Sequence, residues 1–72
     1  MKGNFLYVKI GKRIEKTRRK KGLSQDDLAH IADMDRSHLA KLEEGKINPS
    51  IRSLHKLARK LKVRIASFLK DI

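Results

Sequence analysis

The chain has 72 residues, 39% hydrophobic and 38% charged, which gives enough apolar surface for one small core and too many charges for a membrane protein. A formal net charge of +11 predicts a polyanionic partner: nucleic acid first, an acidic membrane surface second and an acidic protein third. Cysteine is absent, which excludes disulfides and thiolate zinc sites. The apolar runs are too short for a membrane span or a signal peptide, so we expect a cytoplasmic protein.

The charge is unevenly distributed along the chain. Residues 9–21 hold eight basic residues and one acid, and residues 46–72 hold the same numbers. Between them, residues 23–45 hold two basic residues and six acids. Two basic flanks therefore frame a mildly acidic centre, which indicates that the flanks contact phosphates while the centre recognises a less charged feature.

The periodicity of apolar residues predicts an all-α chain with five helices. Residues 1–7 are expected to form a flexible segment ahead of a single domain over residues 8–72, with Phe5–Ile10 as the one stretch that also fits an extended arm. The first helix is predicted to run from Val8 to Lys21. Its basic last turn suits the negative end of the helix dipole.

The second and third helices are marked by polar N-cap residues. Ser24 is expected to begin a helix over about 24–32, with acids in its first turn. Asp35 is expected to begin a helix over about 35–44, which Gly45 ends.

The fourth helix is predicted to follow Ser50, a third N-cap residue. Its apolar residues recur at helical spacing: Ile51, Leu54, Leu57, Ala58 and Leu61. A last short helix is predicted over about 64–70. Its apolar residues exceed what so short a helix needs to cover its own core.

The second and third helices are joined by residues 33–35, which is the helix-turn-helix arrangement. Ala29 provides a small residue where the two helices cross. At 100° per residue the third helix has two faces. The inward face carries Leu39, Leu42 and Glu43, and the outward face carries Ser37, Ala40, Lys41 and Glu44. The outward mixture of donors, acceptors and a methyl group suits base edges better than a row of phosphates.

The run from Gly22 to Leu61 resembles the phage repressor and Cro (Xre) family of regulators. The motifs that carry the resemblance are Leu23-Ser24-Gln25, Leu28-Ala29, Leu42-Glu43-x-Gly45, Asn48-Pro49-Ser50 and Leu54-x-x-Leu57-Ala58. The resemblance implies a five-helix, lambda-repressor-like DNA-binding domain that forms a homodimer on a near-palindromic operator and controls transcription. The chain departs from the family at Asp33 and Lys62, where the family often has glycine.

Arg36 is our first candidate for reading a base, because a guanidinium at the start of a recognition helix can bind guanine O6 and N7. The alternatives are a phosphate contact or an ion pair with Asp33 or Asp35. The resemblance adds Ser37 and Lys41 as base contacts. Their alternatives are a solvated hydroxyl and a phosphate contact.

Four residues are candidates for contacts with the DNA backbone. Gln25, at the start of the second helix, matches the family position that contacts the operator backbone, and nearby helix amides favour phosphate. Lys46, Asn48 and Arg52 lie around the loop after the third helix. For each of these three, a solvated surface role is the alternative.

Two charged residues lie on apolar stripes. Arg18 follows Ile14 by four residues, and Glu43 follows Leu39 by four. Opposite charges on two inward faces predict a structural ion pair between the first and third helices, and the family pattern agrees.

The apolar residues near the end of the chain suggest a dimer interface. They are Ile65, Phe68, Leu69 and Ile72. Two-fold symmetry would double the number of base-reading side chains. The alternative is that all four close the core of the monomer.

No arrangement of residues indicates an enzyme, a metal site or a cofactor, because the three histidines fall on different predicted helices. We therefore predict a nucleoid-associated regulator of transcription, most simply a repressor or autoregulator, that binds double-stranded DNA. An antitoxin-like protein that neutralises a toxin-like partner and binds DNA for autoregulation is the second hypothesis. A membrane-surface protein is disfavoured by the acidic centre and the few aromatic residues.

Overall fold

A computed structural model describes residues 4–72 and contains five helices and no strand in that range. They are α1 (Asn4–Lys20), α2 (Gln25–Ile31), α3 (Arg36–Glu44), α4 (Ile51–Leu61) and α5 (Ala66–Leu69). The prediction of an all-α, five-helix chain is confirmed. In the described range no helix has the length and apolar character needed to cross a membrane.

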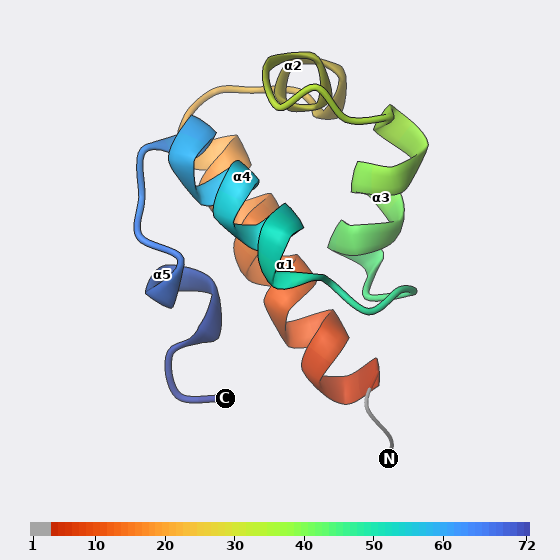
Figure 1. Ribbon diagram of the computed structural model, residues 1–72, viewed down its shortest axis with the longest axis vertical. Helices are drawn as coiled ribbons and strands as arrows, with labels where there is room; N and C mark the ends of the chain where they lie inside the picture. The colour runs from red at the N-terminus through yellow and green to blue at the C-terminus, as the bar shows by residue number, and fades with distance from the viewer. Residues whose placement is uncertain (1–3) are drawn as a thin grey trace.

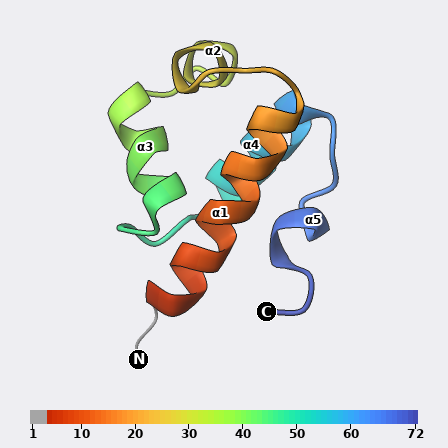
Figure 2. The ribbon, with the colours of Figure 1, turned by 180° about the vertical axis from the view of Figure 1, so that it is seen from behind.

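The long helix α1 is the central element of the fold. It contacts α3, α4 and α5, and Figure 1 shows α3 and α5 on opposite sides of it. Viewed from behind in Figure 2, α1 lies in front of α4, and α2 closes one end of the molecule. Every other helix except α2 is thus positioned directly against α1.

The core is a single cluster to which all five helices contribute. Its largest fully buried side chains are Ile14, Leu28, Leu39, Leu54, Leu57, Leu61 and Phe68. Each contributes roughly 1.5–3 kcal/mol of hydrophobic free energy before conformational entropy is subtracted. Because these residues come from all parts of the chain, the domain has one core and folds as a unit.

Helix α1 begins at Asn4, four residues before the predicted start, and the alternative of an extended arm over Phe5–Ile10 is wrong. The apolar series Tyr7, Ile10 and Ile14 continues the helical spacing of the core stripe into this segment. The expected flexible segment therefore overlaps the first turn of α1 at residues 4–7. Residues 1–3 of that prediction lie outside the described residues.

The predicted N-cap residues lie at the starts of their helices. The Ser24 hydroxyl accepts from the Asp27 amide at 3.0 Å, and the Asp27 carboxylate accepts from the Ser24 amide at 2.9 Å, which is a capping box. The hydrogen bond that the Asp27 carboxylate accepts from the Ser24 backbone lowers the pKa of Asp27, and the Ser24 side chain lowers it further. Ser50 caps α4 by accepting from the Ser53 amide, whereas the Asp35 side chain makes no cap bond to α3.

Phe68 does not belong to the surface that was predicted as a dimer interface. Its side chain is 0% exposed and packs in the core of the monomer. Helix α5 is also shorter than predicted. Lys62 caps the end of α4, and the chain then turns through residues 63–65 before α5 begins at Ala66. The Arg13 guanidinium donates to the Lys70 carbonyl and attaches the end of the chain to α1. The prediction for Phe68 is wrong: its ring closes the monomer.

Glycine allows α1 and α3 to approach closely. A Cβ atom at Gly11 would lie 2.4 Å from the Leu42 carbonyl oxygen and 2.5 Å from that of Glu43. At the end of α3, Gly45 has a positive φ of 73°, and a Cβ there would lie 2.5 Å from the Val8 Cα atom. The obstacles include backbone atoms at both positions, so a side chain at Gly11 or Gly45 would force the two segments apart.

Gly11→Ala should destabilise the domain, although alanine is the better helix former. Helix propensity alone would stabilise α1 by roughly 0.5–1 kcal/mol. The clash with α3 should outweigh this gain, since overpacking costs about 1–3 kcal/mol. The measurement is the free energy of unfolding from urea denaturation. An unchanged or increased stability would contradict the close contact between α1 and α3.

Candidate nucleic-acid interface

A tight turn joins α2 to α3 and fixes the angle between them. The Ala32 amide donates to the Leu28 carbonyl at 2.8 Å, and the Met34 amide donates to the Ala29 carbonyl at 2.9 Å. Asp33 between them adopts a left-handed conformation with φ of 55°, the conformation that the family's usual glycine takes most easily. The turn therefore ends α2 and starts α3 within residues 33–35.

Helix α3 presents one buried face and one exposed face. Leu39, Leu42 and Glu43 are buried against α1 and α2. The predicted base-reading residues Arg36, Ser37 and Lys41 are all exposed on the other side. The structure therefore places these three side chains on the solvent face of a helix held rigidly on its inner side.

Arg36 forms an ion pair with Asp26, a partner that was not predicted. Its Nε atom lies 3.1 Å from the Asp26 carboxylate on α2, not beside Asp33 or Asp35. The Arg36 side chain is 63% exposed and that of Asp26 78% exposed. Exposed pairs of this kind contribute about 0–1 kcal/mol, so only a small free energy holds Arg36 to Asp26.

The other residues predicted to contact the DNA backbone lie around α3. Lys46 follows its last turn, and its ammonium lies 3.2 Å from the Glu44 carboxylate. Asn48 in the next loop and Arg52 in the first turn of α4 are exposed. These three residues belong to one continuous segment after α3, whereas Gln25 lies at the start of α2.

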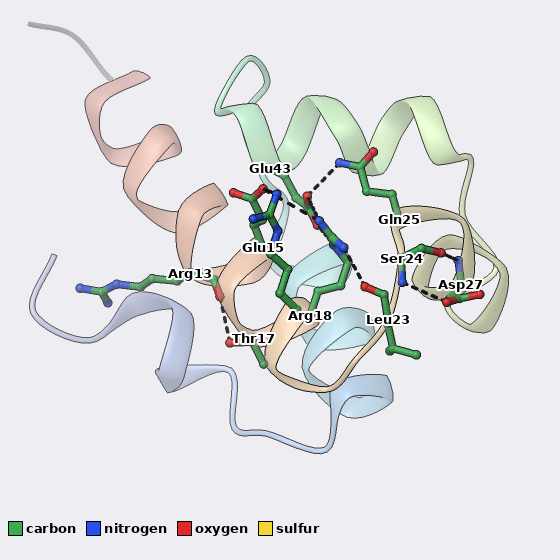
Figure 3. A network of polar contacts seen from close by, with 10 residues as sticks. Arg13, Glu15, Thr17, Arg18, Leu23, Ser24, Gln25, Asp27 and Glu43 are labelled. Carbon is green, nitrogen blue, oxygen red and sulfur yellow. Dashed lines mark hydrogen bonds and ion pairs between the residues drawn. The ribbon is translucent and has the colours of Figure 1, made fainter.

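Gln25 contacts α3 directly. Its Nε2 atom donates to Glu43 Oε1 at 2.9 Å, which fixes a partly buried side chain between the two helices (Figure 3). The predicted role of Gln25 is a phosphate contact, and its hydrogen bond to Glu43 was not predicted. The position of Gln25 in the first turn of α2, facing α3, was the available signal for it.

The predicted ion pair between Arg18 and Glu43 forms in the interior. Arg18 and Glu43 are 6% and 5% exposed. Arg18 Nε lies 2.7 Å from Glu43 Oε2, and Arg18 Nη2 donates to Glu43 Oε1 at 3.1 Å (Figure 3). A third bond runs from Arg18 Nη1 to the Leu23 carbonyl at 2.7 Å. The hydrogen bond to Glu43 raises the pKa of Arg18, so the guanidinium stays charged.

Glu43→Gln should strongly destabilise the domain, because the charge of Arg18 would stay buried without a carboxylate. Removing one partner of a buried pair costs about 3–5 kcal/mol, comparable with the net stability of about 3–5 kcal/mol of a core this small. We expect a large fall in the thermal unfolding midpoint, measured by circular dichroism.

The control is Arg18→Met combined with Glu43→Leu, which removes both charges and preserves much of the volume. It should recover much of the lost midpoint, since buried pairs can often be replaced by apolar residues. If Glu43→Gln unfolded at the wild-type temperature, the pair would not stabilise the fold.

Known proteins share this arrangement. A helix-turn-helix family profile (HTH_3) matches residues 14–68. Control protein C.MunI from Mycoplasma sp. is 31% identical over 70 residues, which cover 96% of this chain and 95% of that protein. The restriction-modification controller C.AhdI from Aeromonas hydrophila has a TM-score of 0.83 and 37% identity, over 86% of this chain and 94% of that one.

A structure of the biofilm regulator SinR in complex with DNA has a TM-score of 0.81 and 37% identity, over 85% of this chain and 98% of that chain. Residues 14–68, which match the family profile, include the helix-turn-helix and α4. The chain belongs to the HTH_3 helix-turn-helix family of transcriptional regulators, which are not enzymes.

Proposed function

We propose that this chain is a homodimeric transcriptional regulator that reads a near-palindromic operator in the major groove of DNA. The observation that carries the proposal is the exposed face of α3, which holds Arg36, Ser37 and Lys41 on a helix whose other face is buried. The SinR complex supports DNA as the ligand of this fold. Binding over a promoter would repress transcription by excluding other proteins from the site.

In this proposal the candidate side chains divide into base-reading and phosphate-binding groups. Arg36 binds guanine O6 and N7 with its planar fork, while Ser37 and Lys41 contact neighbouring base edges. Gln25, Lys46, Asn48 and Arg52 hold the backbone and fix the register of α3 in the groove. The division predicts that only the first group discriminates between sequences.

We place the dimer interface at the end of the chain, without Phe68. Ile72 is 44% exposed, and Ile65 and Leu69 are only partly buried against the core. A second copy would cover these side chains and bring two recognition helices to major grooves about 34 Å apart. One α3 offers few base contacts, so the dimer is what provides useful specificity.

The experiment that tests the function is selection of bound duplexes from a random library at ~150 mM salt, where attraction through counterion release is weakened. A two-fold symmetric motif would support both base reading and the dimer. A pool without sequence preference would reject the proposal and direct attention to a protein partner.

Arg36→Ala should relax base preference at one position in each half-site. The selected base there should lose about 1–3 kcal/mol of discrimination, measured by competition between single-base variants of the operator. The matched control is Lys46→Ala, which also breaks one exposed ion pair next to α3. It should weaken all sequences evenly and lower the salt slope by about 0.9 for each chain of the dimer. Equal discrimination in wild type and Arg36→Ala would remove Arg36 from base reading.

Ile72→Asp should convert the dimer to monomers without unfolding the chain, because Ile72 is exposed and adds little to the core. The measurement is sedimentation equilibrium, with circular dichroism to confirm that helix content is retained. Phe68→Asp serves as the contrast, because a carboxylate in the core should unfold the monomer. A dimer that persists in Ile72→Asp would place the interface elsewhere.

A further inference from the structure

We propose that the carboxyl-terminal ends of α1 and α4 form a second phosphate-binding surface, which contacts the duplex DNA that flanks the operator. The inference rests on the proposed function and extends it, because this surface lies apart from the recognition helix. It would add affinity without reading sequence.

The surface is a cluster of five basic side chains, which we name the end cluster. Its members are Lys20, Lys21, Arg59, Lys60 and Lys62, and all are exposed. Figures 1 and 2 show the carboxyl-terminal ends of α1 and α4 at the same end of the molecule, on the side away from α3. The two helices are in contact, so the fold brings together charges that are about 40 positions apart in the sequence.

None of the five side chains is neutralised by an acid. Among residues 4–72, no carboxylate lies within salt-bridge distance of the end cluster. Beside α3, Arg36 is paired with Asp26 and Lys46 with Glu44, whereas among residues 4–72 no carboxylate lies within salt-bridge distance of Lys41 or Arg52. The end cluster therefore gathers more unpaired positive charge than the proposed base-reading face does.

Stabilisation of the helix ends accounts for only part of this charge. Each helix carries the equivalent of roughly half a negative charge at its carboxyl end, so the two ends together need about one positive charge. The end cluster supplies five. About four positive charges remain, enough to attract a polyanion.

The backbone conformation at Lys62 gives an independent indication that the charge is useful. Lys62 caps α4 in the left-handed region with φ of 60°. Glycine adopts this conformation with less strain than lysine. A lysine there retains a positive charge at a position where glycine would fit the backbone better.

DNA fits the end cluster better than a protein or a membrane does. The exposed large hydrophobic side chains are Phe5, Leu6, Ile31, Ile51 and Ile72, and none belongs to the last turns of α1 or α4. Protein interfaces and membrane-bound helices both need apolar anchors. A purely cationic surface matches the phosphates of a duplex, which present one charge per about 1.7 Å of its axis.

The test compares binding to two duplexes that share the selected operator. One ends at the operator, and the other extends by about two helical turns, or 20 bp, on each side. The variant Arg59→Gln/Lys60→Gln/Lys62→Gly removes three charges from the end cluster. The matched control Lys9→Gln/Lys12→Gln/Lys16→Gln removes three charges from the preceding turns of α1.

For wild type, the slope of log Kobs against log salt concentration should be steeper on the long duplex by about 0.9 for each added phosphate contact. The cluster variant should lose most of this difference between duplexes, and the control should keep it. Lys62→Gly alone should reduce the difference by about 0.9 per chain while folding at least as stably as wild type.

Equal slopes on the two duplexes would overturn the inference, and so would an equal loss in the cluster variant and the control. Sequence-specific binding to the short duplex with no effect of the flanks would leave the proposed function intact and reject this surface alone. Failure to bind the short duplex with any base preference would instead reject the proposed function.

Discussion

The buried carboxylate of Glu43 is the group on which the geometry of the interface depends. It belongs to α3, accepts two hydrogen bonds from Arg18 on α1 and one from Gln25 on α2. Arg18 also binds the Leu23 carbonyl in the segment that leads into α2. One carboxylate thus fixes the recognition helix to both other elements that set its orientation, and directional hydrogen bonds do this more specifically than apolar packing.

The contact between α1 and α3 adds a steric constraint to this polar one. At Gly11 the nearest neighbours are backbone atoms of α3, and at Gly45 they are the backbone and one side-chain carbon of Val8, so both approaches leave little room to repack. A helix held in this way cannot rotate or slide without losing the ion pair, so its exposed side chains keep one arrangement. Such preorganisation lowers the entropy lost when the side chains engage a ligand, and the gain applies to every contact that α3 makes.

The sequence predicts well where short-range signals determine structure. The N-caps at Ser24 and Ser50 depend on a few neighbouring residues, and the pair of Arg18 with Glu43 follows from helical spacing. Other tertiary contacts, which no charged residue on an apolar stripe marks, were not predictable in this way. The role of Phe68 depends on how the chain returns to α1, and the pairing of Arg36 with Asp26 depends on the angle between α2 and α3.

The distribution of ion pairs separates attraction from discrimination. Long-range attraction to phosphates strengthens binding to every sequence alike, and excess charge beside α3 would therefore favour non-specific sites as much as the operator. Carboxylates at Asp26 and Glu44 offset that attraction locally, because each must be displaced from its basic partner. In the proposed base-reading role, Arg36 would give up Asp26 with a net gain only where two directed bonds to a guanine replace one exposed ion pair. The acidic centre of a strongly basic chain thereby increases the ratio of specific to non-specific binding, the quantity that a regulator needs among many competing sites.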